Sequence, residues 1–171
     1  MSTRASTLPP LSPAEFKLFN RMADTMQSLH QHFEVRWNVM YEVAKLGTRP
    51  PGMSIKNYLN LCQEFCQNLE KHHQIEETFV FPSLAKRMPA FANEDALINQ
   101  HRVIHNGLEN LQSYVQSCLD GRVELRWNEV KDILDSFGAT LMDHLKEEVR
   151  QLGAEETRKY WTAQEMTRMP M

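Results

Sequence analysis

The sequence predicts an all-α fold: an up-down-up-down four-helix bundle with a short helix appended at the C-terminus. Two observations support this fold class. Four segments carry apolar side chains at steps of three and four residues, the spacing that lines one face of a helix. Short connections rich in glycine and proline separate these segments, and no segment shows the sustained alternation of a strand.

The first helix is expected to begin after Ser12. Ser12 can cap the helix, Pro13 suits its first position, and Glu15 can close a capping box. Gly47 is expected to end the helix, and the residues at 48–52, which include two prolines and a glycine, disfavour its continuation. The residues on its predicted core stripe are Phe19, Met22, Met26, His30, Phe33, Trp37, Met40, Tyr41 and Ala44. Residues 1–11, which precede it, are rich in Ser, Thr and Pro and are predicted to form a flexible N-terminal segment.

The second helix is expected to begin near Ser54. Pro82 should end or kink it, because proline lacks the amide hydrogen that a helix interior needs. The stretch from there to Pro89 is predicted to be a short helical turn or a loop. The predicted core stripe of this helix contains Tyr58, Leu61, Phe65, Leu69, His72, Glu76 and Phe79.

The third helix is predicted from around Asn93 to Gly121, with Glu94 and Asp95 in its first turn, where the helix dipole favours acids. Its predicted stripe contains Leu97, His101, Ile104, His105, Leu108, Leu111, Val115 and Cys118. The fourth helix is predicted from about Val123 to Leu152, and its stripe contains Val130, Leu134, Phe137, Leu141, His144, Glu148 and Leu152. The bundle thus occupies residues 12–153. The tail, 154–171, carries a capping signal at Thr162 and Glu165 and should form a short helix packed on the bundle.

Length and composition narrow the function classes. A chain of 171 residues fits one domain, and a net charge of −3 without blocks of like charge argues against nucleic acid as a partner. No continuous apolar run indicates a signal peptide or a membrane span, so no membrane partner is expected. The three cysteines lack framework spacing, which favours free thiols in a reducing compartment and a cytoplasmic location.

Potential metal ligands lie on all four predicted core stripes. Three pairs have a spacing of four residues, and a lone histidine sits on the first helix; the candidates are His30, His72, Glu76, His101, His105, His144 and Glu148. Any one of these histidines alone would more often be a surface or hydrogen-bonded side chain. Burying seven such groups together, however, costs several kcal/mol per charged group unless a cation lies between them.

The donor set favours iron. Five imidazoles and two carboxylates without a cysteine exceed what one tetrahedral zinc needs and suit a pair of non-haem iron ions. Ferritin-like sites place glutamate before histidine at a spacing of three and are richer in carboxylates, so they fit less well. His32 and His73 lie off the stripes and are predicted to be at the surface or outside the ligand set.

The sequence resembles the hemerythrin-like (HHE cation-binding) domains. The stretch from His72 to Pro82, HHQIEETFVFP, is similar to the H-H-x-x-E-E-x-x-x-F-P signature of that family. The stretch at 144–148, HLKEE, resembles a second copy, and 100–108, QHRVIHNGL, resembles the third-helix His-x-x-x-His segment. The similarity covers roughly residues 15–153, and the end of the chain from Lys159 is similar to single-domain members from filamentous fungi.

The resemblance implies a ligand arrangement. His30 and His72 would bind one iron, while His101, His105 and His144 would bind the other, with Glu76 and Glu148 bridging the two. The oxygen-carrying hemerythrins place an aspartate five residues after the last histidine, whereas here a glutamate follows after four. This departure weakens the case for reversible oxygen carriage and leaves di-iron binding untouched. A second departure is the additional His32 beside His30.

The implied coordination leaves room for a small ligand. With an oxo or hydroxo bridge, the two irons would keep one vacant position, on the iron with two histidines, for dioxygen or another small diatomic. An aromatic-rich shell of Phe33, Trp37, Phe65, Phe79 and Phe137 would limit access of water. Three hypotheses follow: a protein that binds or senses dioxygen, an oxidase or oxygenase acting on a small organic substrate, and a structural or regulatory module that responds to iron. No phosphate-binding loop, nucleophile elbow or nicotinamide fingerprint is present, so any enzyme activity would depend on the metal.

Overall fold

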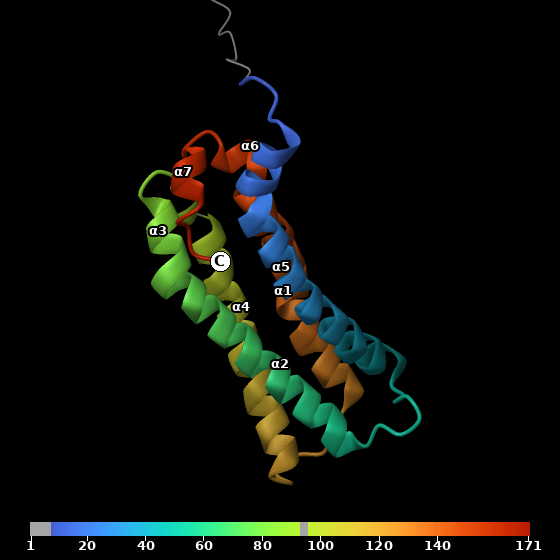
Figure 1. Cartoon of the computed structure of the whole chain (residues 1–171). Coiled ribbons are helices and arrows are strands. Elements are labelled where there is room, and N and C mark those ends of the chain that lie inside the picture. The colour runs from blue at the N-terminus through green and yellow to red at the C-terminus, as the bar shows by residue number, and fades with distance from the viewer. Residues whose placement is uncertain (1–7, 93–95) are drawn as a thin grey trace, which may run out of the picture.

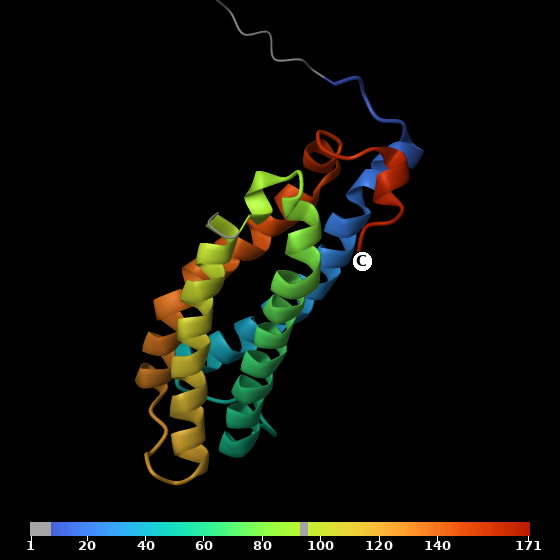
Figure 2. The ribbon, with the colours of Figure 1, turned by 90° about the vertical axis from the view of Figure 1, so that its left-hand side faces the viewer.

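The computed structural model describes residues 8–92 and 96–171, and within them four long helices form an antiparallel bundle (Figures 1 and 2). The long helices are α1 (Pro13–Leu46), α2 (Ile55–Ile75), α4 (Ala96–Leu119) and α5 (Trp127–Leu152). α5 packs against both α1 and α4, and α2 closes the bundle against α4 and α1. The predicted fold class is therefore confirmed. The expected start of the third helix at Asn93, with its acidic first turn, lies outside the described residues, as do residues 1–7 of the N-terminal segment.

The helix ends follow local sequence signals. The Ser12 hydroxyl accepts a hydrogen bond from the Glu15 amide, and the Glu15 carboxylate accepts one from the Ser12 amide, so the capping box at α1 is complete. At the other end Gly47 adopts a left-handed conformation, with φ at 67°, and its amide donates to the Val43 carbonyl. No helix in the described part of the chain is both long and apolar enough to cross a membrane.

The end of α2 differs from the prediction. The prediction was that Pro82 would end or kink this helix. In the structure the regular α-helix ends earlier, at Ile75, and the chain passes through a π-helical turn, η1 (Glu76–Val80), before it continues as α3 (Phe81–Ala85) and a 3-10 turn, η2 (Pro89–Phe91). The Phe81 amide donates to the Glu76 carbonyl five residues back. A wider turn rotates the following side chains around the helix axis. Phe79, predicted in the core, is consequently 65% exposed, whereas Phe81 is buried.

The core consists of two hydrophobic clusters stacked along the bundle. One lies toward the end with the α1–α2 and α4–α5 connections and includes Trp37, Phe65 and Phe137. The other lies toward α3, α6 and α7 and includes Met22, Phe81 and Trp161. Along α1, α4 and α5 the candidate metal ligands fall between residues of the first cluster and residues of the second, and those of α2 and η1 fall between Leu69 of the first cluster and Val80 of the second. A polar layer thus separates two apolar halves.

Two glycines permit the helices of the first cluster to approach closely. A Cβ added at Gly107 on α4 would come within 2.2 Å of the Phe137 ring on α5. A Cβ added at Gly138 would come within 2.7 Å of the Trp37 indole on α1. Large aromatic side chains therefore fill the space directly beneath the polar layer, because both facing positions lack side chains.

The C-terminal residues pack against the beginning of α1. They form two short helices, α6 (Ala154–Thr157) and α7 (Ala163–Met166), at the top of the bundle in Figure 1. The Thr157 hydroxyl donates to the Phe19 carbonyl at 2.9 Å, and α7 begins with a capping box formed by Thr162 and Glu165. Arg21 of α1 donates hydrogen bonds to the backbone carbonyls of Met166, the last residue of α7, and of Met169 and Met171, which follow it.

Candidate metal centre

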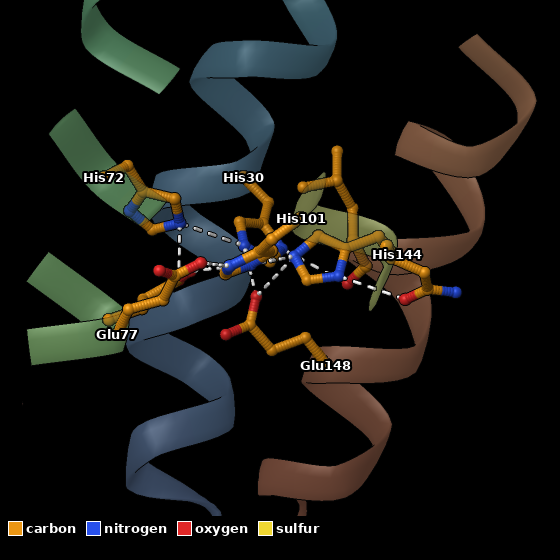
Figure 3. Close-up of polar contacts among 9 residues, drawn as sticks. His30, His72, Glu77, His101, His144 and Glu148 are labelled. Carbon is orange, nitrogen blue, oxygen red and sulfur yellow. Dashed lines mark hydrogen bonds and ion pairs between the residues drawn. The ribbon is translucent and has the colours of Figure 1, made fainter. Parts of the chain in front are cut away.

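Imidazole and carboxylate groups from the four long helices and from η1 meet in the polar layer. Figure 3 shows the side chains of His30, His72, His101, His144 and Glu148 pointing toward one another. All are buried except His72, whose side chain is 12% exposed. The members of this layer are His30 from α1, His72 and His73 from α2, Glu76 from η1, His101 from α4, and His144 and Glu148 from α5.

One group of ligand atoms surrounds a point between α1, α2 and α5. Nε2 of His72 lies 2.7 Å from Oε1 of Glu76 and 3.4 Å from Nε2 of His30. Nε2 of His30 in turn lies 3.2 Å from Oε2 of Glu148. Each of these four residues offers a ligand atom within 4.8 Å of the others, a spacing that could hold one metal ion.

A second group lies beside the first and shares Glu76 with it. His73, Glu76, His101 and His144 again offer ligand atoms within 4.8 Å of one another. Nε2 of His101 lies 3.1 Å from Nε2 of His144 and 3.4 Å from Oε2 of Glu76. The two oxygens of Glu76 therefore face different groups, Oε1 toward His72 and Oε2 toward His101. Glu148 also touches both groups, since its Oε2 lies 3.5 Å from Nε2 of His144.

Three imidazole rings of the layer are oriented by hydrogen bonds at Nδ1, the ring nitrogen that faces away from the other potential ligands. In each ring Nδ1 faces an acceptor, so the neutral imidazole carries its proton on Nδ1 and presents the Nε2 lone pair to the centre. This is the tautomer that a metal-binding histidine needs. The acceptors are the Leu145 carbonyl for His30 at 3.2 Å, Glu77 Oε1 for His101 at 2.7 Å and Gln100 Oε1 for His144 at 3.1 Å.

The electrostatics of the layer favour a cation. Burial and the nearby charge of Glu148 raise the pKa of Glu76 well above its usual range. Burial opposes ionisation of Glu148 too, but contacts with His30 and the imidazole of His144 lower its pKa overall. Burial also lowers the pKa of His144 to about 3, so that ring stays neutral. Two adjacent buried carboxylates cannot both ionise easily unless positive charge lies between them.

Unpaired polar atoms test whether a metal fits. Among the described residues, the buried side-chain atoms that lack a hydrogen-bond partner include both oxygens of Glu76, both oxygens of Glu148 and Nε2 of His73. The carboxylate oxygens lie near imidazole nitrogens, as given above, but without hydrogen-bond geometry. Buried groups of this kind cost free energy unless they are satisfied. All five atoms belong to the two groups of potential ligands, and metal ions placed within these groups would satisfy them.

His73 occupies a different place from the one predicted. The prediction put it at the surface or outside the ligand set, yet it is 6% exposed, and its ring stacks on His101 with centroids 3.8 Å apart. The sequence did contain a signal. Cys62, Cys66, Leu69 and His73 follow one another at steps of four, three and four, and all four are buried. The buried face of α2 is wider than the single stripe that was assigned to it.

His105 also departs from the prediction. It was expected among the ligands, but it is 48% exposed, and its ring nitrogens lie 3.1 Å from a carboxylate oxygen of Glu70 and 3.2 Å from one of Glu109. The buried stripe of α4 continues from His101 to Ile104 and Leu108. His105 is one residue beyond Ile104, or about 100° around the helix, so it faces away from the other six predicted ligands. The structure brings those six together.

Two pockets flank the polar layer. A pocket of about 400 Å³ is bordered by α1, α2 and η1, and reaches His72 and Glu76 in the first group. A second, of about 270 Å³, reaches His73 and His101 in the other group and is bordered by charged side chains, including Glu70 and Arg102. The two halves of the centre therefore adjoin surroundings of different character.

Fold and site together define a helical-bundle metal-binding protein, with potential ligands on the four long helices and on η1. The chain belongs to the hemerythrin family: the model for the hemerythrin HHE cation-binding domain matches residues 16–154. This match covers the four long helices, apart from the first three residues of α1, and every residue of the polar layer. Binding of a metal cation is the property that the family description itself states.

A curated relative is more distant. The chain is 29% identical over 106 residues to the dimeric xanthone biosynthesis cluster protein R11 of Cryptosporiopsis sp. (strain 8999). The aligned part covers 57% of this chain and 38% of that protein, so the chain spans well under two thirds of the relative's length. No solved structure matches the chain.

Proposed function

We propose that this protein is a non-haem di-iron protein that binds dioxygen or another small diatomic. The ligands would be five histidines and two carboxylates: His30, His72, His73, His101, His144, Glu76 and Glu148. This set takes His73 in place of His105. The observation that carries the proposal is the position of Glu76, whose two oxygens face two separate groups of potential ligands. A carboxylate in this position suits a bridge between two metal ions.

The ligand count leaves one position for a small molecule. Two octahedral ions have twelve positions; five imidazoles, two bridging carboxylates and a shared oxo or hydroxo group would occupy eleven. Since His73, His101 and His144 belong to one group, the remaining position would fall on the side of His30 and His72. A ferrous pair at this centre would supply two electrons to a bound dioxygen molecule.

The residues around the centre would hold the ligands in place and keep water out. The neighbouring cluster presents Trp37, Phe65 and Phe137, all buried, and the half-buried Phe33. Phe33 lies against the ring of His72, with centroids 5.2 Å apart. An apolar shell of this kind limits loss of a reactive species to solvent. The hydrogen bonds to Leu145, Glu77 and Gln100 would keep the rings oriented in the absence of metal.

Anaerobic titration with ferrous iron tests the proposal. The protein should bind close to two equivalents, and Glu76→Gln should bind one or none, because an amide oxygen is a weaker ligand and cannot balance the charge of two ions. Glu109→Gln, a matched change at an exposed acid on α4, should keep two. A single equivalent in the unaltered protein, or two in Glu76→Gln, would contradict the proposal.

Exposure of the ferrous protein to air distinguishes dioxygen binding from the other two candidate functions. A stable absorption band that disappears on removal of oxygen supports dioxygen binding. The second candidate is an oxidase or oxygenase acting on a small organic molecule, and the 400 Å³ pocket that reaches His72 and Glu76 favours it. The relative's name, which places it in a biosynthesis cluster, is consistent with this candidate. Rapid decay of the band would support it, and no reaction with oxygen would indicate a structural or regulatory iron module.

A further inference from the structure

The pocket beside His72 has the features of a binding site for a particular chemical class. Its inner end is formed by the buried Glu76 and the nearly buried His72. Its volume, about 400 Å³, lies in the range of small-molecule sites, roughly 300 to 1,000 Å³. A cavity that ends at a candidate metal position can bring a ligand next to that position.

Most of the walls are apolar. They come from α1, α2, η1 and the segment after α7: Met26, Leu29, Phe33, Ile75, Val80 and Met171. Leu29 and Ile75 are 41% and 46% exposed, so the mouth of the pocket leaves apolar surface in contact with water. Phe33 and the His72 imidazole provide ring faces and edges, and methionine sulfurs make favourable contacts with aromatic rings. These walls favour a flat aromatic ring over a flexible polar molecule.

The charged side chains that line the pocket are of one sign apart from that of Glu76. Arg36 and Lys71 both line it, together with His32. Within the described residues neither Arg36 nor Lys71 forms an ion pair; Arg36 donates one hydrogen bond to the His32 carbonyl of its own helix. Two cations without acidic partners at an apolar pocket favour an anionic ligand. The pocket on the opposite side of the centre differs, since two acidic side chains, Glu70 and Glu77, line it together with Arg102.

We propose that the pocket between α1 and α2 binds a small aromatic monoanion, a carboxylate or a phenolate. Its ring would contact Phe33 and Leu29, and its charge would lie near Arg36 and Lys71. The ligand would thereby be held beside His72, at the half of the centre that has the free position. This inference rests on the proposed di-iron function only for its chemical purpose; binding itself depends on residues of the chain that do not ligate metal.

Isothermal titration calorimetry with 2-naphthoate tests the proposal on metal-free and iron-loaded protein. The unaltered protein should bind one equivalent, and Arg36→Gln and Lys71→Gln should each weaken binding about fivefold, the effect typical of a partly exposed charge. Ile75→Trp, which fills the mouth, should abolish it. Lys45→Gln, on the same helix as Arg36 but outside the pocket, should bind as the unaltered protein does. The neutral 2-naphthalenemethanol should bind at least about tenfold more weakly than the acid.

The imidazole proton signals in the nuclear magnetic resonance spectrum of the metal-free protein locate the ligand. Addition of 2-naphthoate should shift the His72 signal and leave that of His105, at the opposite pocket, in place. Absence of binding, binding that is unaffected by Arg36→Gln and Lys71→Gln together, or a shift of His105 alone would overturn the inference. Iron stoichiometry of the same samples separates this outcome from failure of the di-iron proposal. Binding of two irons without binding of naphthoate contradicts only the pocket. Binding of naphthoate by protein that cannot be loaded with two irons contradicts only the di-iron centre.

Discussion

His73 of α2 and His101 of α4 stack face to face, with ring centroids 3.8 Å apart and planes inclined by 13°. The contact joins two helices at the level of the candidate metal centre. It holds in the core a histidine whose Nε2 has no hydrogen-bond partner among the described residues. The second candidate group has three imidazoles only if His73 is counted.

The first prediction distinguishes His73 from His105. His73→Ala should reduce ferrous iron binding from two equivalents to about one, because the second group would keep only His101, His144 and the shared Glu76. His105→Ala should keep both equivalents, since its side chain is paired at the surface with Glu70 and Glu109. Anaerobic titration of both variants provides the measurement. The reverse pattern would restore the ligand set that the sequence resemblance implied.

The second prediction concerns Gly107. Alanine in place of a helical glycine ordinarily stabilises a helix by about 1 kcal/mol. Here the new Cβ would lie 2.2 Å from the Phe137 ring, so the ring or the helix must move. Overpacking of a core costs about 1 to 3 kcal/mol, which at such a short distance should exceed the gain in helix propensity. Urea unfolding should therefore show Gly107→Ala to be less stable than the unaltered protein.

A double-mutant cycle isolates the cause. In the background of Phe137→Ala, the change Gly107→Ala should cost nothing or become stabilising, because the ring that the new methyl group meets is absent. Equal destabilisation in both backgrounds would show that close packing against Phe137 is not the reason for glycine at this position.

The third prediction concerns the acid dependence of the C-terminal contact. The hydrogen bonds with Arg87 and the Thr162 amide lower the pKa of Glu165 from 4.5 to about 2. Because the folded-state pKa is below the unfolded value, this carboxylate stabilises the docked tail fully above pH 4.5. The contribution declines as the pH falls from 4.5 and is lost below about 2. Glu165→Gln should thus speed amide hydrogen exchange at 160–169 at neutral pH and match the unaltered protein near pH 2.

A matched control is available in the same segment. Glu155 is exposed and pairs with Arg158 at 3.6 Å, outside the contact with Arg87. Glu155→Gln should leave exchange at 160–169 unchanged across the same range. If both variants behave alike, the contact between Glu165 and Arg87 does not hold the tail in place.

The fold was predictable because its signals are local. Caps such as Ser12 and breakers such as Gly47 act within a few residues, and the apolar stripes set which helix faces meet. The same stripes brought six of the seven predicted ligands into one layer. The apolar pattern of a helix does not show how wide its buried face will be. His73 is buried because α2 contacts both α1 and α4, and these contacts depend on the tertiary structure. His105 had the right spacing from His101 but lies outside the contact face of α4.

The π turn was unpredictable for a related reason. Pro82 indicates only that the regular hydrogen-bond pattern must change, and ending the helix, kinking it and widening one turn all satisfy that requirement. The widened turn is what turns Phe79 outward and Phe81 inward. Likewise, the capping signal at Thr162 predicted a short helix. The contact of the last residues with Arg21 could not be predicted, because it depends on where the C-terminal segment packs against α1.

The last prediction concerns the second carboxylate of the centre. Glu148 is fully buried and lies between His30 and His144, whereas its neighbour Glu147 pairs with Arg150 at the surface. Glu148→Gln removes a buried negative charge that two cations would require, so ferrous iron binding should fall to one equivalent or fewer. Glu147→Gln should bind two equivalents, with the same optical spectrum in air as the unaltered protein. Two tight equivalents in Glu148→Gln would mean that Glu76 alone bridges the ions or that another acid on α5, Asp143 or Glu147, takes over.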